Sequence, residues 1–172
     1  KITSTAEHAF ALILSSVRNI PAASQSVSNG EWNYEKFIGR QMNKMTIGVI
    51  GYGRLGSIFA GYCLSFGSKV LVYDPYKKLK EKGIEQLKEL KDLISKSDIV
   101  SIHVHVNEET IELINESSLK HAKKDVLIIN TSRGEVINET DAVDFLKSNT
   151  KAKIASDVLT DEINNRLKSA LY

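Results

Sequence analysis

The sequence predicts an α/β fold, a doubly wound parallel sheet with helices on both faces in three α/β/α layers. Three observations lead to this prediction. Short apolar runs typical of buried parallel strands alternate with helical patterns along the chain. A glycine-rich turn joins the first such run to a helix. The chain has 172 residues, enough for one domain with a substantial core. We expect one domain over residues 1–172, with strand order 3-2-1-4-5-6.

The chain is expected to open with a helix over residues 4–20. Ser4 or Thr5 can cap this helix, and Pro21 follows its end. Its apolar residues share one face: Ala6, Phe10, Ile13, Leu14 and Val17. A short helix gains most of its stability from packing, so this face needs a partner surface. His8 is interpreted as a packing or capping residue rather than a catalytic one.

Residues 22–44 are polar and are predicted to be irregular. We interpret them as an arm that Trp32 and Phe37 fasten to the domain or to another subunit. The helix and the arm need burial beyond what one domain supplies. A closed twofold dimer is the commonest protein assembly, so we expect a homodimer built partly through residues 4–40.

The first strand, Ile47–Ile50, leads into a glycine turn in which Gly51, Gly53 and Gly56 fit the pattern G-x-G-x-x-G. The first glycine permits the tight turn, the second lets a pyrophosphate approach the backbone, and the third lets the helix pack closely on the strand. The free N–H groups and dipole of the helix start would face the phosphates. Gly67 is placed to end this helix.

A second strand, Val70–Tyr73, ends at Asp74, whose carboxylate can accept hydrogen bonds from a ribose diol. The order of strand, glycine turn, helix, strand and acid is the order of a dinucleotide site in a Rossmann fold. The alternative is a glycine turn in some other parallel-sheet protein.

The rest of the chain continues the alternation after a lysine-rich, solvated connection over residues 77–82. The expected elements are a short edge strand over 84–87, a short helix from Leu90, a strand over 99–106, a helical stretch from Ile111, an apolar strand over 126–129, a helix capped by Asn138 and a last strand over 154–158. Five polar residues fall at or just beyond the carboxyl ends of these strands: Asp74, His103, Arg133, Asp157 and Glu162. Ligands of doubly wound sheets bind at this edge.

Composition narrows the function classes. The chain has 23 basic and 21 acidic residues and no basic stripe with interleaved aromatics, so we expect no nucleic-acid partner. It has no apolar run of 18 residues and no signal peptide, so we expect no membrane partner. The single Cys63 is interpreted as a buried filler and suits a cytoplasmic protein. No metal site is expected.

The chain resembles the D-2-hydroxyacid dehydrogenase family, and within it the phosphoglycerate dehydrogenase-like members. The resemblance covers nearly the whole chain. Its motifs are the Thr-Ala-Glu-His helix, Arg18–Pro21, Gly51–Gly56, Tyr73–Pro75, Ser97–Asp98, Asn130–Gly134 and Asp157–Val158. The Asn-Thr-Ser-Arg-Gly element at 130–134 is the most specific of these.

The resemblance implies a role for each matching residue. Arg133 would bind the substrate carboxylate and polarise its 2-oxo group, which suits a guanidinium that can clamp a carboxylate with two bonds. Glu162 would pair with a catalytic histidine and stabilise its protonated form. The implied cofactor is NAD. The cofactor contacts would come from Gly51, Gly53, Arg54, Leu55, Gly56, Asp74, His103, Val104, His105, Thr110, Thr131, Ser132, Arg133 and Asp157.

The chain departs from the family pattern in three ways. His105 stands where the family usually has proline. The family's catalytic histidine lies beyond the position of Glu162, in a Pro-His motif, and this chain has no match to it. The substrate-binding domain has no match either. We therefore expect the chain to be the cofactor domain of a larger enzyme, with residues 1–44 as an interdomain helix and arm.

The leading interpretation is the NAD-binding domain of an oxidoreductase that transfers a hydride between a nicotinamide cofactor and a D-2-hydroxy acid, with 3-phosphoglycerate as one candidate. Its partner would be a small 2-hydroxy or 2-oxo acid. The alternative is a non-catalytic module of the same fold that senses NAD(H) and binds partner proteins, although such a sensor needs neither Arg133 nor Glu162. A methyltransferase is a more distant alternative.

Overall fold

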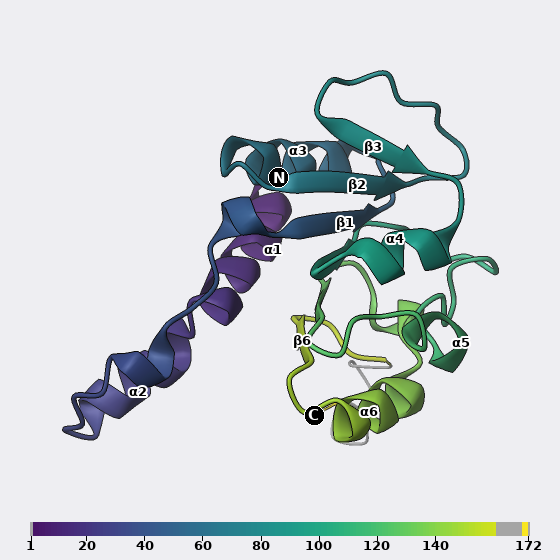
Figure 1. Cartoon of the computed structure of the whole chain (residues 1–172). Helices are drawn as coiled ribbons and strands as arrows, with labels where there is room; N and C mark the ends of the chain where they lie inside the picture. The colour runs from purple at the N-terminus through teal and green to yellow at the C-terminus, as the bar shows by residue number, and fades with distance from the viewer. Residues whose placement is uncertain (1, 161–169, 172) are drawn as a thin grey trace.

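A computed structural model describes residues 2–160, 170 and 171 (Figure 1). In this part of the chain the strands form one parallel sheet of six, in the order β3-β2-β1-β4-β5-β6, and the predicted order is therefore confirmed. The strands are β1 Thr46–Ile50, β2 Lys69–Tyr73, β3 Ile84–Leu87, β4 Ile99–Ile102, β5 Leu127–Asn130 and β6 Lys153–Ser156. The order reverses between β1 and β4, which is the point where such sheets bind ligands.

The helices are α1 Ile2–Val17, α2 Ile20–Ser28, α3 Arg54–Ser65, α4 Leu90–Lys96, α5 Glu116–Leu119 and α6 Glu139–Ser148. Short 3-10 turns lie at η1 Glu35–Phe37, η2 Met42–Lys44 and η3 Gly134–Val136. None of the helices in the described ranges is both long enough and apolar enough to cross a membrane.

Alternating strand residues supply two cores, one on each face of the sheet. Ile47 and Val49 of β1 pack in the core that α1 and α3 cover, whereas Ile50 packs in the core that α4, α5 and α6 cover. This is the two-residue period of a strand buried on both faces. Phe59 and Leu93 are fully buried on opposite faces, and burial of such a side chain contributes about 1.5–3 kcal/mol.

The apolar face of α1 packs against α3 of the same chain. Phe10 contacts the rings of Phe59, Tyr62 and Phe66, with centroids 6.4, 5.9 and 4.8 Å away. Ile13 is fully buried in the same core. The expectation that this face lacks burial within one domain is therefore wrong, because α3 provides the partner surface.

The prediction of an irregular segment after Pro21 is also wrong in its first part. Helix α1 ends at Val17, and α2 begins at Ile20 with Pro21 in its first turn. Asn19 has a left-handed backbone, with φ of 54°, which breaks the path between the two helices. Proline is favourable in the first turn of a helix because its missing N–H would have no helical acceptor there. Pro21 therefore starts a helix instead of following one.

Smaller differences occur where strands leave the sheet. The fourth strand ends at Ile102 rather than at residue 106, and the last strand ends at Ser156 rather than at residue 158. The His103 N–H still donates to Ile50 O at 2.8 Å, and the chain then turns across the carboxyl edge. Little of the helical stretch expected after Ile111 forms, since the helix there is the single turn of α5. These shortened strands leave loop residues at the edge where the site lies.

Candidate functional site

Two neighbouring hollows, of about 600 and 350 Å³, lie along the carboxyl edge of the sheet. The predicted site residues shared by both are Gly53, His103, Val104 and His105. The larger hollow adds Arg54, Leu55, Thr131, Ser132 and Arg133. The smaller hollow adds Gly51, Asp74 and Thr110. The site therefore has two lobes that meet at the glycine turn.

The glycine turn holds α3 against the end of β1. Gly51 has φ of +87°, and a Cβ there would lie 2.7 Å from His103 O. A Cβ on Gly56 would lie 2.1 Å from Gly51 O, so only glycine permits this helix to approach so closely. A Cβ on Gly53 would meet no protein atom within 4 Å. The space in front of Gly53 thus stays open for a ligand.

The start of α3 faces this space. Gly53 is the N-cap, and the first helical bond runs from the Ser57 N–H to Gly53 O at 3.0 Å. The N–H groups of Arg54 and Leu55 precede that bond, so they have no acceptor within the helix. Together with the helix dipole and the Arg54 side chain, they favour an anionic ligand such as a pyrophosphate.

Asp74 is held at the end of β2 by two backbone groups. Its carboxylate accepts the Tyr52 N–H at 2.9 Å and the Tyr76 N–H at 3.0 Å. Tyr52 lies between the first two glycines of the turn, so one of these bonds joins the acid directly to the glycine turn. A carboxylate with two oxygens has about four lone-pair sites, which leaves acceptor capacity for a ribose diol.

His103 lies beneath the turn rather than on its surface. Its ring is 4.6 Å from that of Phe59, and Nε2 is 2.9 Å from Ser101 Oγ. Burial disfavours the charged imidazolium and lowers the pKa of His103 from 6.5 to about 4. The ring is therefore neutral at pH 7. His105 is exposed, and its carbonyl accepts the Thr110 hydroxyl at 2.6 Å, which closes the loop beside the smaller hollow.

The turn after β5 is organised by Asn130, a role that was not predicted from the sequence. Asn130 Oδ1 accepts the N–H and the hydroxyl of Ser132, and Nδ2 donates to Arg133 O at 2.9 Å. Asparagine commonly folds its side chain onto the backbone of a turn, so its position at the strand end was the available signal. Arg133 is exposed at the wall of the larger hollow, where Nη1 donates to Ser132 O at 2.7 Å.

Buried polar atoms beside the hollows suggest that a ligand completes the site. Within the described residues, His103 Nδ1 and Thr131 Oγ1 are buried without a hydrogen-bond partner. Such groups normally have a partner. The open space at Gly53, the oriented acid and the two-lobed shape together fit a dinucleotide.

Among the described residues, two predicted site residues do not line either hollow: Gly56, which is packed against Gly51, and Asp157. Asp157 follows β6, and its Oδ2 lies 3.4 Å from His8 Nε2 of α1. Neither hollow includes Asp157 among the lining residues in the described ranges. Glu162 lies outside the described residues.

Other lining residues did not emerge from the sequence. Thr5 and Glu135 border the larger hollow, and Tyr76 and Glu109 border the smaller one. The Tyr76 hydroxyl donates to Glu109, so the loops after β2 and β4 meet over the smaller hollow. This hydrogen bond raises the pKa of Tyr76 above its usual value. No sequence pattern indicates such a contact, because it joins two loops.

Comparisons with known proteins agree with this geometry. Residues 10–171 match the family model described as D-isomer specific 2-hydroxyacid dehydrogenase, NAD binding domain. The chain belongs to this family. The matched unit is the one that binds NAD, so the cofactor and the Rossmann fold predicted from the sequence are confirmed.

Three relatives illustrate the match. D-3-phosphoglycerate dehydrogenase of Archaeoglobus fulgidus is 37% identical over 161 residues, which is 92% of this chain and 31% of that protein. 2-Hydroxyacid dehydrogenase A of Aspergillus oryzae is 39% identical over 91% of this chain and 45% of that protein. D-Lactate dehydrogenase of Aquifex aeolicus, solved with NAD and lactic acid, is 37% identical with a TM-score of 0.91, over 98% of this chain and 51% of that one.

The chain thus spans about a third to a half of the length of these relatives. All three are named as dehydrogenases, so a non-catalytic NADH-sensing module is not favoured.

Proposed function

We propose that this domain carries the NAD of an oxidoreductase that interconverts a D-2-hydroxy acid and a 2-oxo acid. The observation that supports it is the larger hollow, which has the start of α3 and Arg133 on its walls. The nicotinamide ring supplies hydride acceptance and donation when NAD is bound. Phosphoglycerate is one candidate substrate, since the relative from Archaeoglobus fulgidus is a D-3-phosphoglycerate dehydrogenase.

Arg133 would bind the substrate. Its guanidinium has five N–H donors, and the bond to Ser132 O uses one of them. The remaining donors suit a bidentate clamp on the substrate carboxylate together with a bond to the 2-oxo oxygen, on which negative charge builds as hydride arrives. Thr131 and Ser132, both buried at the same wall, would contact the nicotinamide end.

The proton would move through a histidine outside this chain. By the resemblance, Glu162 would pair with that histidine and favour its protonated form, ready to donate to the 2-oxo oxygen. A substrate-binding domain would lie elsewhere in a longer protein. Residues 1–172 would form one cofactor domain, with residues 1–44 as its interdomain helix and arm.

A binding titration separates the cofactor step from the reaction. We expect the chain to quench or enhance NADH fluorescence saturably without reducing NAD in the presence of any 2-hydroxy acid. The longer protein should reduce NAD with 3-phosphoglycerate, D-lactate or another D-2-hydroxy acid. A longer protein that binds NADH but oxidises none of these acids would contradict the proposed reaction. Turnover by the chain alone would contradict the need for a second domain.

We also propose that the protein is a homodimer in the cytoplasm. α2 and the segment after it project away from the sheet (Figure 1). The structure starts the arm at Ile20, where α2 begins, and its projecting part is residues 20–38. This part exposes several large apolar side chains: Ile20, Val27, Trp32, Tyr34 and Ile38. A second copy of the chain could cover them. Cys63, the single cysteine, is buried in α3 and has no need of an oxidising compartment.

A further inference from the structure

The loop that carries Asp74 is fastened by one side chain of the neighbouring strand. Gln86 of β3 donates through Nε2 to Asp74 O at 3.1 Å and to Lys77 O at 2.6 Å. Its Oε1 accepts the Leu79 N–H at 2.9 Å. The amide thus uses both donors and its acceptor on three residues of a single loop. The strand pairing does not itself hold this loop, because β2 pairs with β3 only up to Tyr73 and Leu87.

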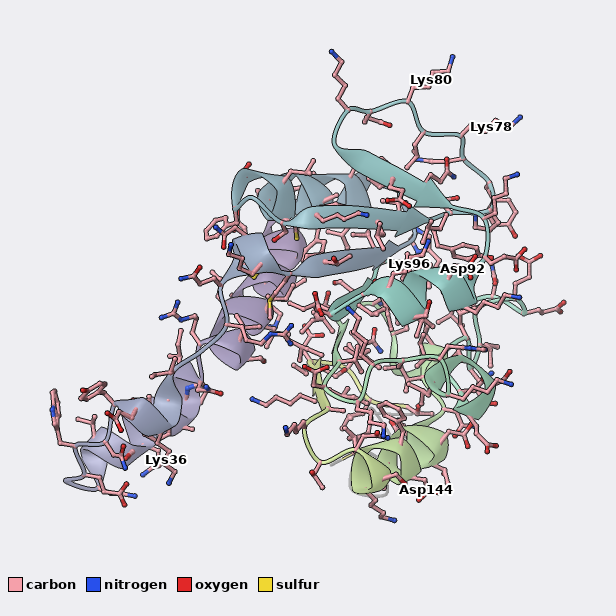
Figure 2. The ribbon with its side chains drawn as sticks, in the orientation of Figure 1. Lys36, Lys78, Lys80, Asp92, Lys96 and Asp144 are labelled. Atoms are coloured by element: carbon pink, nitrogen blue, oxygen red, sulfur yellow. The ribbon has the colours of Figure 1, made fainter. Side chains whose placement is uncertain are left out.

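The fastened loop returns two bonds to the glycine turn. Asp74 accepts the Tyr52 N–H at 2.9 Å, and Lys77 Nζ donates to Tyr52 O at 2.7 Å. Both backbone polar groups of the residue between Gly51 and Gly53 are therefore held from the same loop. The ammonium of Lys77 is directed toward the turn, whereas Lys78 and Lys80 point outward from the loop (Figure 2).

This arrangement bears on which cofactor the site accepts. NADP carries a phosphate on the ribose 2′ oxygen, where NAD has a hydroxyl that a carboxylate can bind. A free lysine beside Asp74 could offset the repulsion between the carboxylate and that phosphate. Lys77 is the nearest lysine to Asp74 in sequence, and its ammonium is engaged by Tyr52 O instead.

We propose that Gln86 is a positioning residue for cofactor selection, because it holds Asp74 toward the ribose and keeps Lys77 on the glycine turn. Gln86 itself does not border either hollow among the described lining residues. Its effect passes through the loop from Asp74 to Leu79. The inference depends on NAD binding at this site and is independent of the proposed dehydrogenase reaction.

The test compares dissociation constants for NADH and NADPH, measured by cofactor fluorescence on the same protein. Gln86→Leu keeps the bulk of the side chain and removes its three bonds. We expect NADH to bind about three- to tenfold more weakly, in line with the loss of one or two net hydrogen bonds at the acid. NADPH affinity should stay equal or rise, so the preference for NADH narrows. Glu85→Gln, on the same strand with its side chain paired to Lys69, is the matched control and should leave both constants unchanged.

Lys77→Met tests the role of Lys77 separately from that of Asp74. In the wild-type background it should change NADPH affinity by less than about twofold, because the ammonium already has an acceptor. In the Gln86→Leu background it should abolish any gain in NADPH affinity. Gln86→Glu provides a second variant, since it keeps the Leu79 bond but sets a charge against two carbonyl groups, and it should shift the preference in the same direction.

An equal loss of NADH and NADPH affinity in both Gln86 variants would overturn the inference, because it would indicate a general structural role. A large NADPH loss in Lys77→Met alone would overturn it too, since Lys77 would then already serve the phosphate. A wild-type protein that binds neither cofactor would contradict NAD binding at this site instead.

Discussion

The orientation of the Asp74 carboxylate depends on backbone N–H groups of two loops. Its position after the second strand predicted an acid at the carboxyl edge of the sheet, and Asp74 lies there in the wall of the smaller hollow. The two N–H groups that orient it, from Tyr52 and Tyr76, were not predictable. They depend on the exact path of two loops, which residue type does not determine.

Asp74 should make the site prefer NAD to NADP by at least about tenfold, since a hydrogen bond to a charged group contributes about 1.5–3 kcal/mol. Asp74→Ala should narrow that preference mainly by weakening NADH. Fluorescence titration of both reduced cofactors measures the change. Equal or tighter NADPH binding by the wild type would show that the role given to Asp74 is wrong.

In the proposed longer enzyme, Arg133→Ala should lower turnover by about 10²–10³-fold, the range seen when one transition-state donor is removed. NADH affinity should change little, because the side chain is assigned to the substrate. Arg54→Ala is the matched control, since Arg54 lies at the start of α3 and should affect cofactor binding first. If Arg133→Ala weakens NADH as much as it slows turnover, Arg133 holds the cofactor or the turn.

His103 should make the fold sensitive to acid. Its pKa is about 4 in the folded chain, against the ordinary histidine value of 6.5 once the chain unfolds, so the unfolded chain binds the proton more readily. The stability that neutral His103 contributes is complete above about pH 6.5 and is lost as the pH falls toward 4. At about 1.4 kcal/mol per pKa unit, the loss is about 3 kcal/mol.

Urea unfolding between pH 7 and 4 measures this dependence. His103→Asn should flatten the curve, whereas His121→Asn, which changes an exposed histidine, should not. Parallel curves for the wild type and His103→Asn would assign the acid sensitivity to other groups.

At the scale of elements, the sequence predicted the strands and their order well but their ends and the arm less well. Buried apolar runs such as Leu127–Ile129 have a composition typical of a central parallel strand. α2 was not predicted because Pro21 was interpreted as the residue that follows the end of a helix. The left-handed backbone of Asn19 shows instead that one helix ends before it and another begins after it. β4 was made too long because the apolar pattern continues to Val106 after the chain has left the sheet.

The close contact between α3 and the end of β1 can be tested by comparing two glycines of α3, Gly56 and Gly61. Gly56→Ala forces a Cβ within 2.1 Å of Gly51 O, a backbone atom that cannot rotate away. We expect a loss of about 1–3 kcal/mol of stability together with weaker NADH binding, because the start of α3 must move from the position proposed to bind the pyrophosphate.

Gly61 lies on the same helix, and a Cβ there meets nothing within 4 Å. Gly61→Ala should therefore stabilise the protein by about 0.5–1 kcal/mol without changing NADH affinity. Thermal unfolding of both variants, with a parallel NADH titration, measures the contrast. Similar effects of the two substitutions would mean that helix propensity, not close packing, governs α3.

At the scale of the whole molecule, α1 and the arm differ in how much of their apolar surface is buried. From the sequence, both were expected to need burial beyond one domain and to contribute to a homodimer through residues 4–40. The structure divides them, since α1 is buried against α3 whereas Trp32, Tyr34 and Ile38 are 85, 72 and 73% exposed. Apolar periodicity identified the buried face of α1 but could not say which surface covers it. The proposed dimer therefore depends on the arm over residues 20–38 alone.

A homodimer through this arm should bury the one tryptophan of the chain, Trp32. Its emission should shift to shorter wavelength as the protein concentration rises through the dissociation constant, in step with the mass from light scattering. Ile38→Asp would place a charge in the interface and should leave a monomer that still binds NADH. Ile111→Asp is the control, because Ile111 is 52% exposed but lies outside the arm. A stable interface buries about 1,200–2,000 Å² in total, which is the area that the contact between two copies must reach. A wild-type protein that remains monomeric at micromolar concentration, with Trp32 emission at the solvent-exposed wavelength throughout, would contradict the dimer.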